Sequence, residues 1–305
     1  MTDLSLKLVP LLALIVFGWV AGKYLGLTRE ALAPTLIYLL SPLTIFKGVL
    51  DATLSTELLL LPFLYIALCS VVCGVGWVLG GFFFKAPARN ILAYTGGNSN
   101  SGYFGFPAAA AFLGPDAFSR AVMISFGFVI YEATVGFFVT ARGHHTVRES
   151  LHKVLRLPQL YVFALGIALN LTGFKADTPA FEFFAWIKGS FLTLGMMLIG
   201  IALAQIKDFR VDWLFTGFAF GMKFLVWPLV TVTVFWLDKH SGLQLLSAPV
   251  KESMWLVSVL PMAANTVAYA SLLRAEPEKC AVAVVLSTLL CLLLLPLAMK
   301  YPAIF

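Results

Sequence analysis

The chain has 305 residues, of which 60% are hydrophobic and only 12% are charged. Soluble domains carry about 25% charged residues. The mean hydropathy is +0.93, and apolar stretches near the ~20 residues needed to cross a bilayer recur along the whole sequence. This composition predicts an all-α polytopic membrane protein and excludes a soluble two-domain protein. The net charge of +6 does not indicate nucleic-acid binding, because the charges are dispersed over short loops.

Hydropathy and loop charges predict ten membrane-spanning segments. They lie near 5–22, 31–50, 58–84, 90–113, 117–140, 158–173, 180–205, 212–237, 251–273 and 278–299. The start of the chain has no basic n-region, so we interpret it as an uncleaved first span. The one long hydrophilic connection, 141–157, divides the spans into a first half, 1–140, and a second half, 158–305. An odd number of spans per half means that repeated halves insert with opposite orientations.

The distribution of lysine and arginine predicts the orientation of the spans. The side that holds the N-terminus has six basic residues, namely Lys7, Arg120, Lys175, Lys239, Lys251 and Lys300. The other side has twelve, namely Lys23, Arg29, Lys85, Arg89, Arg142, Arg148, Lys153, Arg156, Lys207, Arg210, Arg274 and Lys279. Because cytoplasmic loops are enriched in basic residues, we expect both termini on the non-cytoplasmic side of a bacterial inner membrane.

The fourth span is interrupted by small and polar residues. Residues 96–102 read Gly-Gly-Asn-Ser-Asn-Ser-Gly between the apolar stretches 91–94 and 103–113. A helix in lipid must satisfy its own backbone, so such a run is tolerated only where it is buried in protein or lines a wet cavity. In secondary transporters, broken helices of this kind form the substrate site near the membrane midplane.

The ninth span is interrupted at a corresponding position. It contains Pro261, Asn265 and Thr266 in mid-membrane, and a shift of 162 residues carries Ser99 onto Pro261. Two interrupted spans at corresponding positions are typical of an inverted-repeat transporter. The alternative is a coincidence of proline and glycine in two ordinary spans, since both residues are frequent in membrane helices.

Two broken spans that run in opposite directions would bring two helix N-termini together. Each N-terminus carries about half a positive charge and free N–H groups. With uncharged amides and hydroxyls, these groups can hold a carboxylate without a permanent counter-ion. We therefore expect a small organic anion to bind at seven residues, namely Asn98, Ser99, Asn100, Ser101, Pro261, Asn265 and Thr266. Five others are expected to shape the crossover backbone, namely Gly96, Gly97, Gly102, Gly105 and Pro107. The alternative role for Asn100 and Asn265 is interhelical hydrogen bonding, worth about 0.6 kcal/mol each.

Charged residues inside spans are costly in lipid and are further candidates for function. Glu132 in the fifth span has three interpretations: a carrier of a coupling proton, a fixed counter-charge for Lys223, or a neutral partner in an interior hydrogen bond. Lys223 either balances the helix C-termini at the breaks or approaches the anion directly. Lys47 and Lys188 are interpreted as side chains that extend toward an interface.

The sequence favours neither an enzyme nor a cofactor or metal site. The spans contain no aspartate pair and no histidine, which intramembrane proteolysis would need. No Gly-x4-Gly-Lys-Ser/Thr loop is present, so ATP is not expected to drive the protein. The four cysteines lie in apolar spans and are expected to pack in the core. The histidines of the long connection, namely His144, His145 and His152, are expected to be solvated.

Two segments of the chain resemble the crossover motifs of one known family. Residues 98–107 read Asn-Ser-Asn-Ser-Gly-Tyr-Phe-Gly-Phe-Pro, and residues 261–265 read Pro-Met-Ala-Ala-Asn, followed by Glu-Pro-Glu at 276–278. These segments are similar to the fourth and ninth spans of the auxin efflux carrier family, which includes plant PIN proteins and bacterial carboxylate carriers. Weaker matches are 40–43, 194–200, and Lys223 five residues before Pro228.

The resemblance implies two inverted five-helix repeats with helices 4 and 9 broken and crossing, as in bile-acid symporters and sodium/proton antiporters. Spans 1, 2, 6 and 7 would form a scaffold domain that can dimerise, and spans 3–5 and 8–10 a transport domain that moves like an elevator. The chain departs from plant members, because it has Ser99-Asn100 in place of Pro-Asn and no carboxylate within 61–81. A bacterial-type member is the better match.

The expected function is therefore secondary transport of a small organic anion, either a carboxylate or an auxin-like weak acid, with protons as one candidate coupling ion. A channel would show a continuous polar stripe along several spans. The alternative function is a receptor with a carrier fold that binds an organic anion without moving it.

Overall fold

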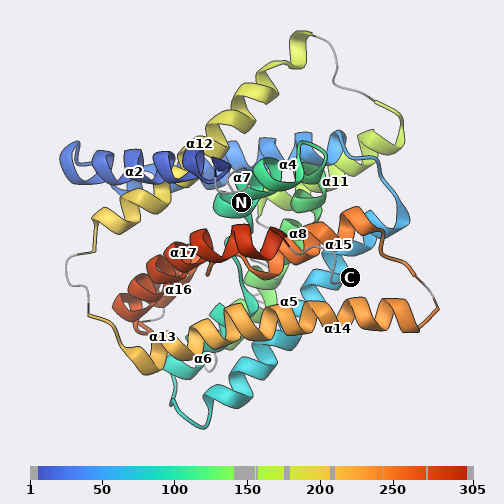
Figure 1. Cartoon of the computed structure of the whole chain (residues 1–305). Helices are drawn as coiled ribbons and strands as arrows, with labels where there is room; N and C mark the ends of the chain where they lie inside the picture. Colours follow the sequence, from blue (N-terminus) through green and yellow to red (C-terminus); the bar gives the residue numbers. More distant parts are fainter. Residues whose placement is uncertain are drawn as a thin grey trace. The chain divides into compact units, whose positions relative to one another are not determined.

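The computed structural model describes residues 6–140, 155, 157–174, 179–206, 210–242, 244–272 and 274–300, and every regular element in these ranges is a helix (Figure 1). Except for positions 155 and 157, the predicted connection 141–157 lies outside the described residues, so its histidines do too. The same holds for two of the loop lysines used to predict orientation, Lys175 and Lys207. Within the described ranges, the chain is all-α, as its composition predicted.

Among the residues that the structure describes, six helical stretches are long and apolar enough to cross a membrane. They are Arg29–Leu50, Thr56–Gly80, Ala117–Thr140, Phe183–Ala204, Trp213–His240 and Pro277–Lys300. The helices α2 (Val9–Tyr24) and α11 (Pro158–Leu171) are apolar but shorter, and the predicted fourth and ninth spans each consist of two short helices. The protein is thus a polytopic helical membrane protein, whereas the count of ten crossings and the inverted repeat stay predictions.

The chain divides into two compact units, each built from three segments that are distant in the sequence. The first comprises Met1–Leu59, Gly102–Met123 and Leu155–Lys207. The second comprises Leu60–Ser101, Ile124–Val154 and Asp208–Phe305. The sequence repeats 1–140 and 158–305, and the expected scaffold and transport domains, stay predictions.

Close contacts between helices hold the first unit together. Its helices are α2, α3 (Arg29–Thr35), η1 (Leu36–Leu40), α4 (Ser41–Leu50), α7 (Phe106–Leu113), α11, η4 (Pro179–Phe181) and α12 (Phe183–Ala204). α2 packs against α12, and α4 packs against α11 (Figure 1). A Cβ atom added to Gly18 would lie 2.6 Å from the Cα atom of Met197, and one added to Gly200 would lie 2.6 Å from the backbone nitrogen of Trp19. Glycine at these positions therefore permits the close approach of two membrane helices.

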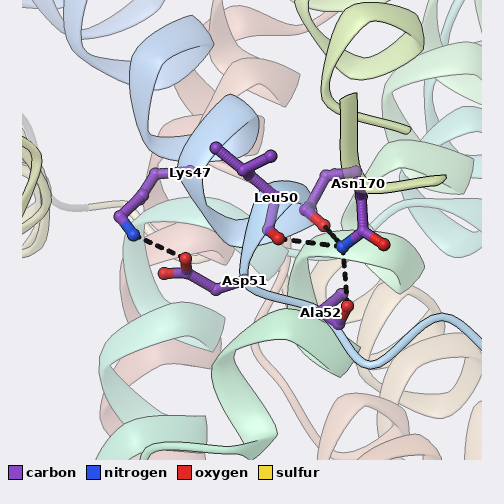
Figure 2. Close-up of polar contacts among 6 residues, drawn as sticks. Lys47, Leu50, Asp51, Ala52 and Asn170 are labelled. Carbon is purple, nitrogen blue, oxygen red and sulfur yellow. Dashed lines mark hydrogen bonds and ion pairs between the residues drawn. The ribbon is translucent and has the colours of Figure 1, made fainter. Parts of the chain in front are cut away.

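Asn170 of α11 anchors the end of α4 in the first unit (Figure 2). Its Nδ2 atom lies 3.1 Å from the carbonyl oxygen of Val49, 2.8 Å from that of Leu50 and 2.7 Å from that of Ala52. A helix end leaves such carbonyls without intrahelical partners, so the amide stabilises it. A cavity of about 550 Å³ adjoins this contact and is lined by residues of 50–54 and 170–174.

The second unit is arranged around α6. Its helices are α5 (Thr56–Gly80), α6 (Ala88–Gly97), η3 (Glu132–Gly136), α9 (Phe137–Thr140), α13 (Trp213–Gly221), η5 (Met222–Val226), α14 (Trp227–His240), α15 (Ala248–Ser258), α16 (Asn265–Leu272) and α17 (Pro277–Lys300). α8 (Ala117–Tyr131) and η2 (Ser101–Gly105) are divided between the units, and residues 56–59 of α5 belong to the first. α6 packs against α9, α13 and α16, and α16 packs against α17. The buried rings of Tyr65 and Trp227 lie 5.4 and 5.6 Å from that of Phe128.

In the described part of the chain, four helical stretches contain a π-helical turn, and three of these turns precede a proline. η1, η2 and η5 each end two residues before a proline, namely Pro42, Pro107 and Pro228. Proline lacks an N–H group and its ring crowds the carbonyl four residues earlier, which explains the widened turns. η3 begins at Glu132, and η5 contains Lys223. Single π turns are frequent at functional sites, and here two of them carry the charged residues singled out from the sequence.

Candidate functional site

The interruption predicted in the fourth span is present in the structure. α6 ends at Gly97, and residues 98–100 are not helical, with Asn98 in an extended conformation at φ −111° and ψ 159°. Glycine is a poor helix former, so Gly96 and Gly97 favour an end at this point. A Cβ atom on Gly97 would lie 2.6 Å from the carbonyl oxygen of Cys69, so close packing also requires glycine here.

Side chains satisfy the carbonyl groups that the end of α6 leaves open. The Tyr131 hydroxyl donates to the Tyr94 carbonyl at 3.0 Å, and the Trp227 indole N–H donates to the Gly96 carbonyl at 2.6 Å. The Asn98 backbone N–H donates to the Thr95 carbonyl at 3.2 Å. The last carbonyls of a helix need partners of this kind. These roles of Tyr131 and Trp227 were not predicted from the sequence. Trp227 could have been suspected, because it lies one helical turn after Lys223.

The interruption predicted in the ninth span is also present, between α15 and α16. Residues 259–264 are not helical, and Pro261 within them has no N–H group to continue a helix. The Met262 backbone N–H donates to the Ser287 hydroxyl at 3.1 Å, and the Cys291 thiol donates to the Val259 carbonyl at 3.3 Å. α17 thus supplies both side chains that stabilise this second break.

The two breaks contact each other directly within the second unit. The backbone N–H of Asn100 donates to the carbonyl of Pro261 at 2.9 Å. The N–H of Ser99 donates to the Asn98 side-chain oxygen, and that of Ser101 to the Ser99 carbonyl, both at 2.8 Å. The expectation that backbone N–H groups of the first break are free for a ligand is therefore wrong for these three residues, because two of them bond within the segment and that of Asn100 bonds to the second break.

One asparagine from each break donates a hydrogen bond to the same carboxylate, that of Glu132. Asn98 Nδ2 lies 3.2 Å from Glu132 Oε2, and Asn265 Nδ2 lies 3.1 Å from Oε1 and 3.4 Å from Oε2. Asn98 Nδ2 also donates to the Tyr94 hydroxyl at 2.9 Å. Asn98 is 1% exposed, whereas Glu132 and Asn265 are half-buried. The amides of two segments 167 positions apart in sequence therefore form one carboxylate-binding pair.

Lys223 contacts the first break from η5. Its side chain is fully buried, its ammonium donates to the Ser99 hydroxyl, and its Nζ atom lies 4.8 Å from the centroid of the Trp227 ring. Among the residues that the structure describes, no ion pair joins Lys223 to Glu132. The two charged groups are instead linked through Ser99 and Asn98, which contact each other.

Of the remaining predicted site residues, Ser101 and Thr266 lie in the second unit and the others in the first. Ser101 lies at the start of η2, and its hydroxyl is 2.9 Å from that of Ser125 on α8. Thr266 is fully buried in α16, and no hydrogen bond to its hydroxyl occurs within the described ranges. Gly102, Gly105 and Pro107 belong to η2 and α7 and lie in the first unit.

The all-helical architecture, its membrane-length apolar helices and its two interrupted helices define the class: an integral, polytopic membrane protein. The chain matches no protein-family model. A protein of Methanothermobacter thermautotrophicus described as an uncharacterized transporter is 23% identical over 261 residues, which cover 81% of this chain and 83% of that protein.

Proposed function

We propose that this protein is a secondary transporter of a small organic anion, and that the anion's carboxylate binds where the two helix breaks meet. The observation that carries the proposal is the convergence of Asn98 and Asn265 on the Glu132 carboxylate, because the same donors fit a carboxylate of a ligand. The similarity to a protein described as a transporter, over most of both chains, supports the transport function.

The chemistry of the site favours an anion over a neutral ligand or a cation. Hydrogen bonds to ionised groups are stronger than those between neutral groups, and two amides provide them here without a charge of their own. Lys223 adds one buried ammonium beside Ser99. A buried ammonium is costly without a partner, so an anion that binds near it offsets that cost.

The transport cycle that we propose is alternating access of the elevator type, which the resemblance to auxin efflux carriers implies. The amides of Asn98 and Asn265, the hydroxyl of Ser99 and both charged groups belong to one compact unit, the second. A ligand held by them would therefore move with that unit as one body. The proposal includes both termini on the non-cytoplasmic side and a carboxylate or auxin-like weak acid as the substrate.

The test is uptake into liposomes of radiolabelled lactate, succinate, malate and indole-3-acetate by the purified protein and by two variants. Asn265→Ala removes an amide that donates to Glu132. Gln205→Ala is the matched control, because this exposed amide also donates to a carboxylate, that of Glu30 at 3.3 Å, in the first unit.

We expect saturable uptake of at least one probe by the wild type and by Gln205→Ala. Asn265→Ala should raise the half-saturating concentration by at least about tenfold, since a hydrogen bond to a charged group contributes ~1.5–3 kcal/mol. Uptake that Asn265→Ala leaves unchanged would overturn the site. Saturable binding without uptake would replace the transporter with a receptor.

A further inference from the structure

The amide donors at the meeting point of the breaks are already engaged. An asparagine Nδ2 carries two hydrogens. Asn98 directs its hydrogens to the Tyr94 hydroxyl and to Glu132 Oε2, and Asn265 directs a hydrogen toward the two oxygens of Glu132. A carboxylate of a ligand that binds to the same amides must therefore compete with the Glu132 carboxylate for them.

The groups around Glu132 do not compensate for a second negative charge. Among the described residues, the titratable groups that face the carboxylate are hydroxyls, that of Tyr94 from α6 and that of Tyr269 from α16. Lys223 from η5 contacts Ser99 instead. Two carboxylates that share one poorly hydrated site do not both stay ionised, because each charge disfavours the other. One of the two must take up a proton.

We infer that Glu132 is the proton-binding group of the transport cycle, and that one proton on it accompanies each bound anion; this inference rests on the proposed function. A proton from water binds the Glu132 carboxylate and makes it a neutral carboxyl, which accepts hydrogen bonds less strongly and releases the amides. The anion then takes the amide hydrogens, and the new O–H of Glu132 can donate to it. When the anion leaves, Glu132 loses the proton to water and returns to the amides.

This cycle moves one proton and one anion in the same direction. For a monocarboxylate the net movement of charge is zero. At zero membrane potential, a transporter of this stoichiometry accumulates its substrate about tenfold for each unit of pH difference, because one unit of pH equals 1.36 kcal/mol per proton.

The test uses liposomes with a pH-sensitive dye inside, potassium and valinomycin to hold the membrane potential at zero, and an external pH one unit below the internal pH. The probes are labelled lactate, succinate and malate, with protein-free liposomes to subtract passive entry. The variant Glu132→Gln keeps a neutral side chain at this position and so resembles the protonated state. The matched control Glu278→Gln removes the same charge from an exposed residue in the first turn of α17.

We expect wild type and Glu278→Gln to accumulate the probe about tenfold, with acidification of the interior. Glu132→Gln should still exchange external label for internal unlabelled probe, but its accumulation ratio should fall to one and its dye signal should disappear. Glu132→Asp retains a titratable carboxyl and should still accumulate the probe, at a reduced rate. This variant shows that a substitution at position 132 does not by itself abolish folding.

Wild-type uptake that does not depend on the pH difference, or accumulation of the probe by Glu132→Gln, would overturn this inference while the proposed function stands. Absence of saturable binding and uptake of every probe would instead overturn the proposed function, and the inference with it.

Discussion

The two helix breaks are stabilised by different side chains. Two large residues from two helices, Tyr131 and Trp227, bind the carbonyls at the first break. Two small residues from one helix, Ser287 and Cys291, stabilise the second. The buried Lys223 ammonium contacts the first break, whereas amides of both breaks reach Glu132. The two interruptions are therefore not chemically equivalent: Lys223 contacts the first, and Asn265 of the second completes the amide pair.

The largest effect is expected from removal of the charge that distinguishes the first break. Lys223→Met should lower transport by about a hundredfold or more, equivalent to ~2.7 kcal/mol, because the anion loses the only buried ammonium that contacts the two breaks in the described ranges. The melting temperature should not fall, since a buried charge is costly. Liposome uptake and thermal unfolding in detergent measure the two quantities.

Lys279→Met is the control for this variant. Lys279 lies at the start of α17 and forms ion pairs with Asp212 and with Glu276, both at 3.1 Å. Normal transport by Lys223→Met, or an equal loss of transport in Lys279→Met, would remove the special role of the first break.

The side chains that bind the backbone at each break should differ in their contribution to stability. Trp227→Phe leaves the buried Gly96 carbonyl without its 2.6 Å donor, and Ser287→Ala leaves the Met262 N–H without its acceptor. Loss of one partner of a buried hydrogen bond costs about 1–3 kcal/mol, and we expect Trp227→Phe to cost more because it also creates a cavity.

Thermal unfolding of each variant against an exposed control tests this expectation. Trp213→Phe and Ser271→Ala make the same substitutions at exposed positions of the second unit. A smaller loss of stability in Trp227→Phe than in Ser287→Ala would reverse the ranking of the two breaks.

The stability of the first break should also depend on a glycine, Gly97 at the end of α6. Residues 259–264 of the second break contain no glycine. Gly97→Ala should lower stability by about 1–2 kcal/mol, because the new methyl group meets the Cys69 carbonyl oxygen on α5. Gly217→Ala, with open space around its Cβ position, should not be destabilised in this way. Equal melting temperatures for the two variants would mean that α5 can move away from the break at little cost.

The smallest effect on stability is expected outside both breaks, at Asp212, which precedes the apolar helix Trp213–His240. Its carboxylate accepts the Phe215 backbone N–H at 3.0 Å, and this bond, with a contribution from Lys279, lowers the pKa of Asp212 below its usual value. The pKa of Asp212 is lower in the folded than in the unfolded state. The stabilisation is therefore present above about pH 4 and is lost as the pH falls through the folded-state pKa. Asp212→Ala should therefore cost less than about 1 kcal/mol at neutral pH, and nothing in strong acid. A difference in melting temperature that grows on acidification would contradict this assignment.

The sequence predicted the interruptions well and their surroundings poorly. Glycine pairs and a proline inside apolar segments have local effects on the backbone, so residues 98–100 and 259–264 could be located without a structure. Glu132 and Lys223 could be singled out because charge is costly in lipid. The partners of the breaks could not, since Tyr131, Trp227 and Ser287 reach them only through packing between helices distant in sequence. The partners of the backbone N–H groups of residues 99–101 could not be predicted either, because they lie within the segment or at Pro261, and composition carries no signal of such contacts.

The most direct test of the central claim, that both breaks form one anion site, is a double-mutant cycle between Asn98 and Asn265. The dissociation constant of the transported probe is measured for wild type, Asn98→Ala, Asn265→Ala and the double variant. If both amides hold one carboxylate, the effects should be non-additive by about 0.5–3 kcal/mol, as for residues that share a partner. Additive effects, within the ~0.3–0.5 kcal/mol expected of independent sites, would contradict a shared site at the two breaks.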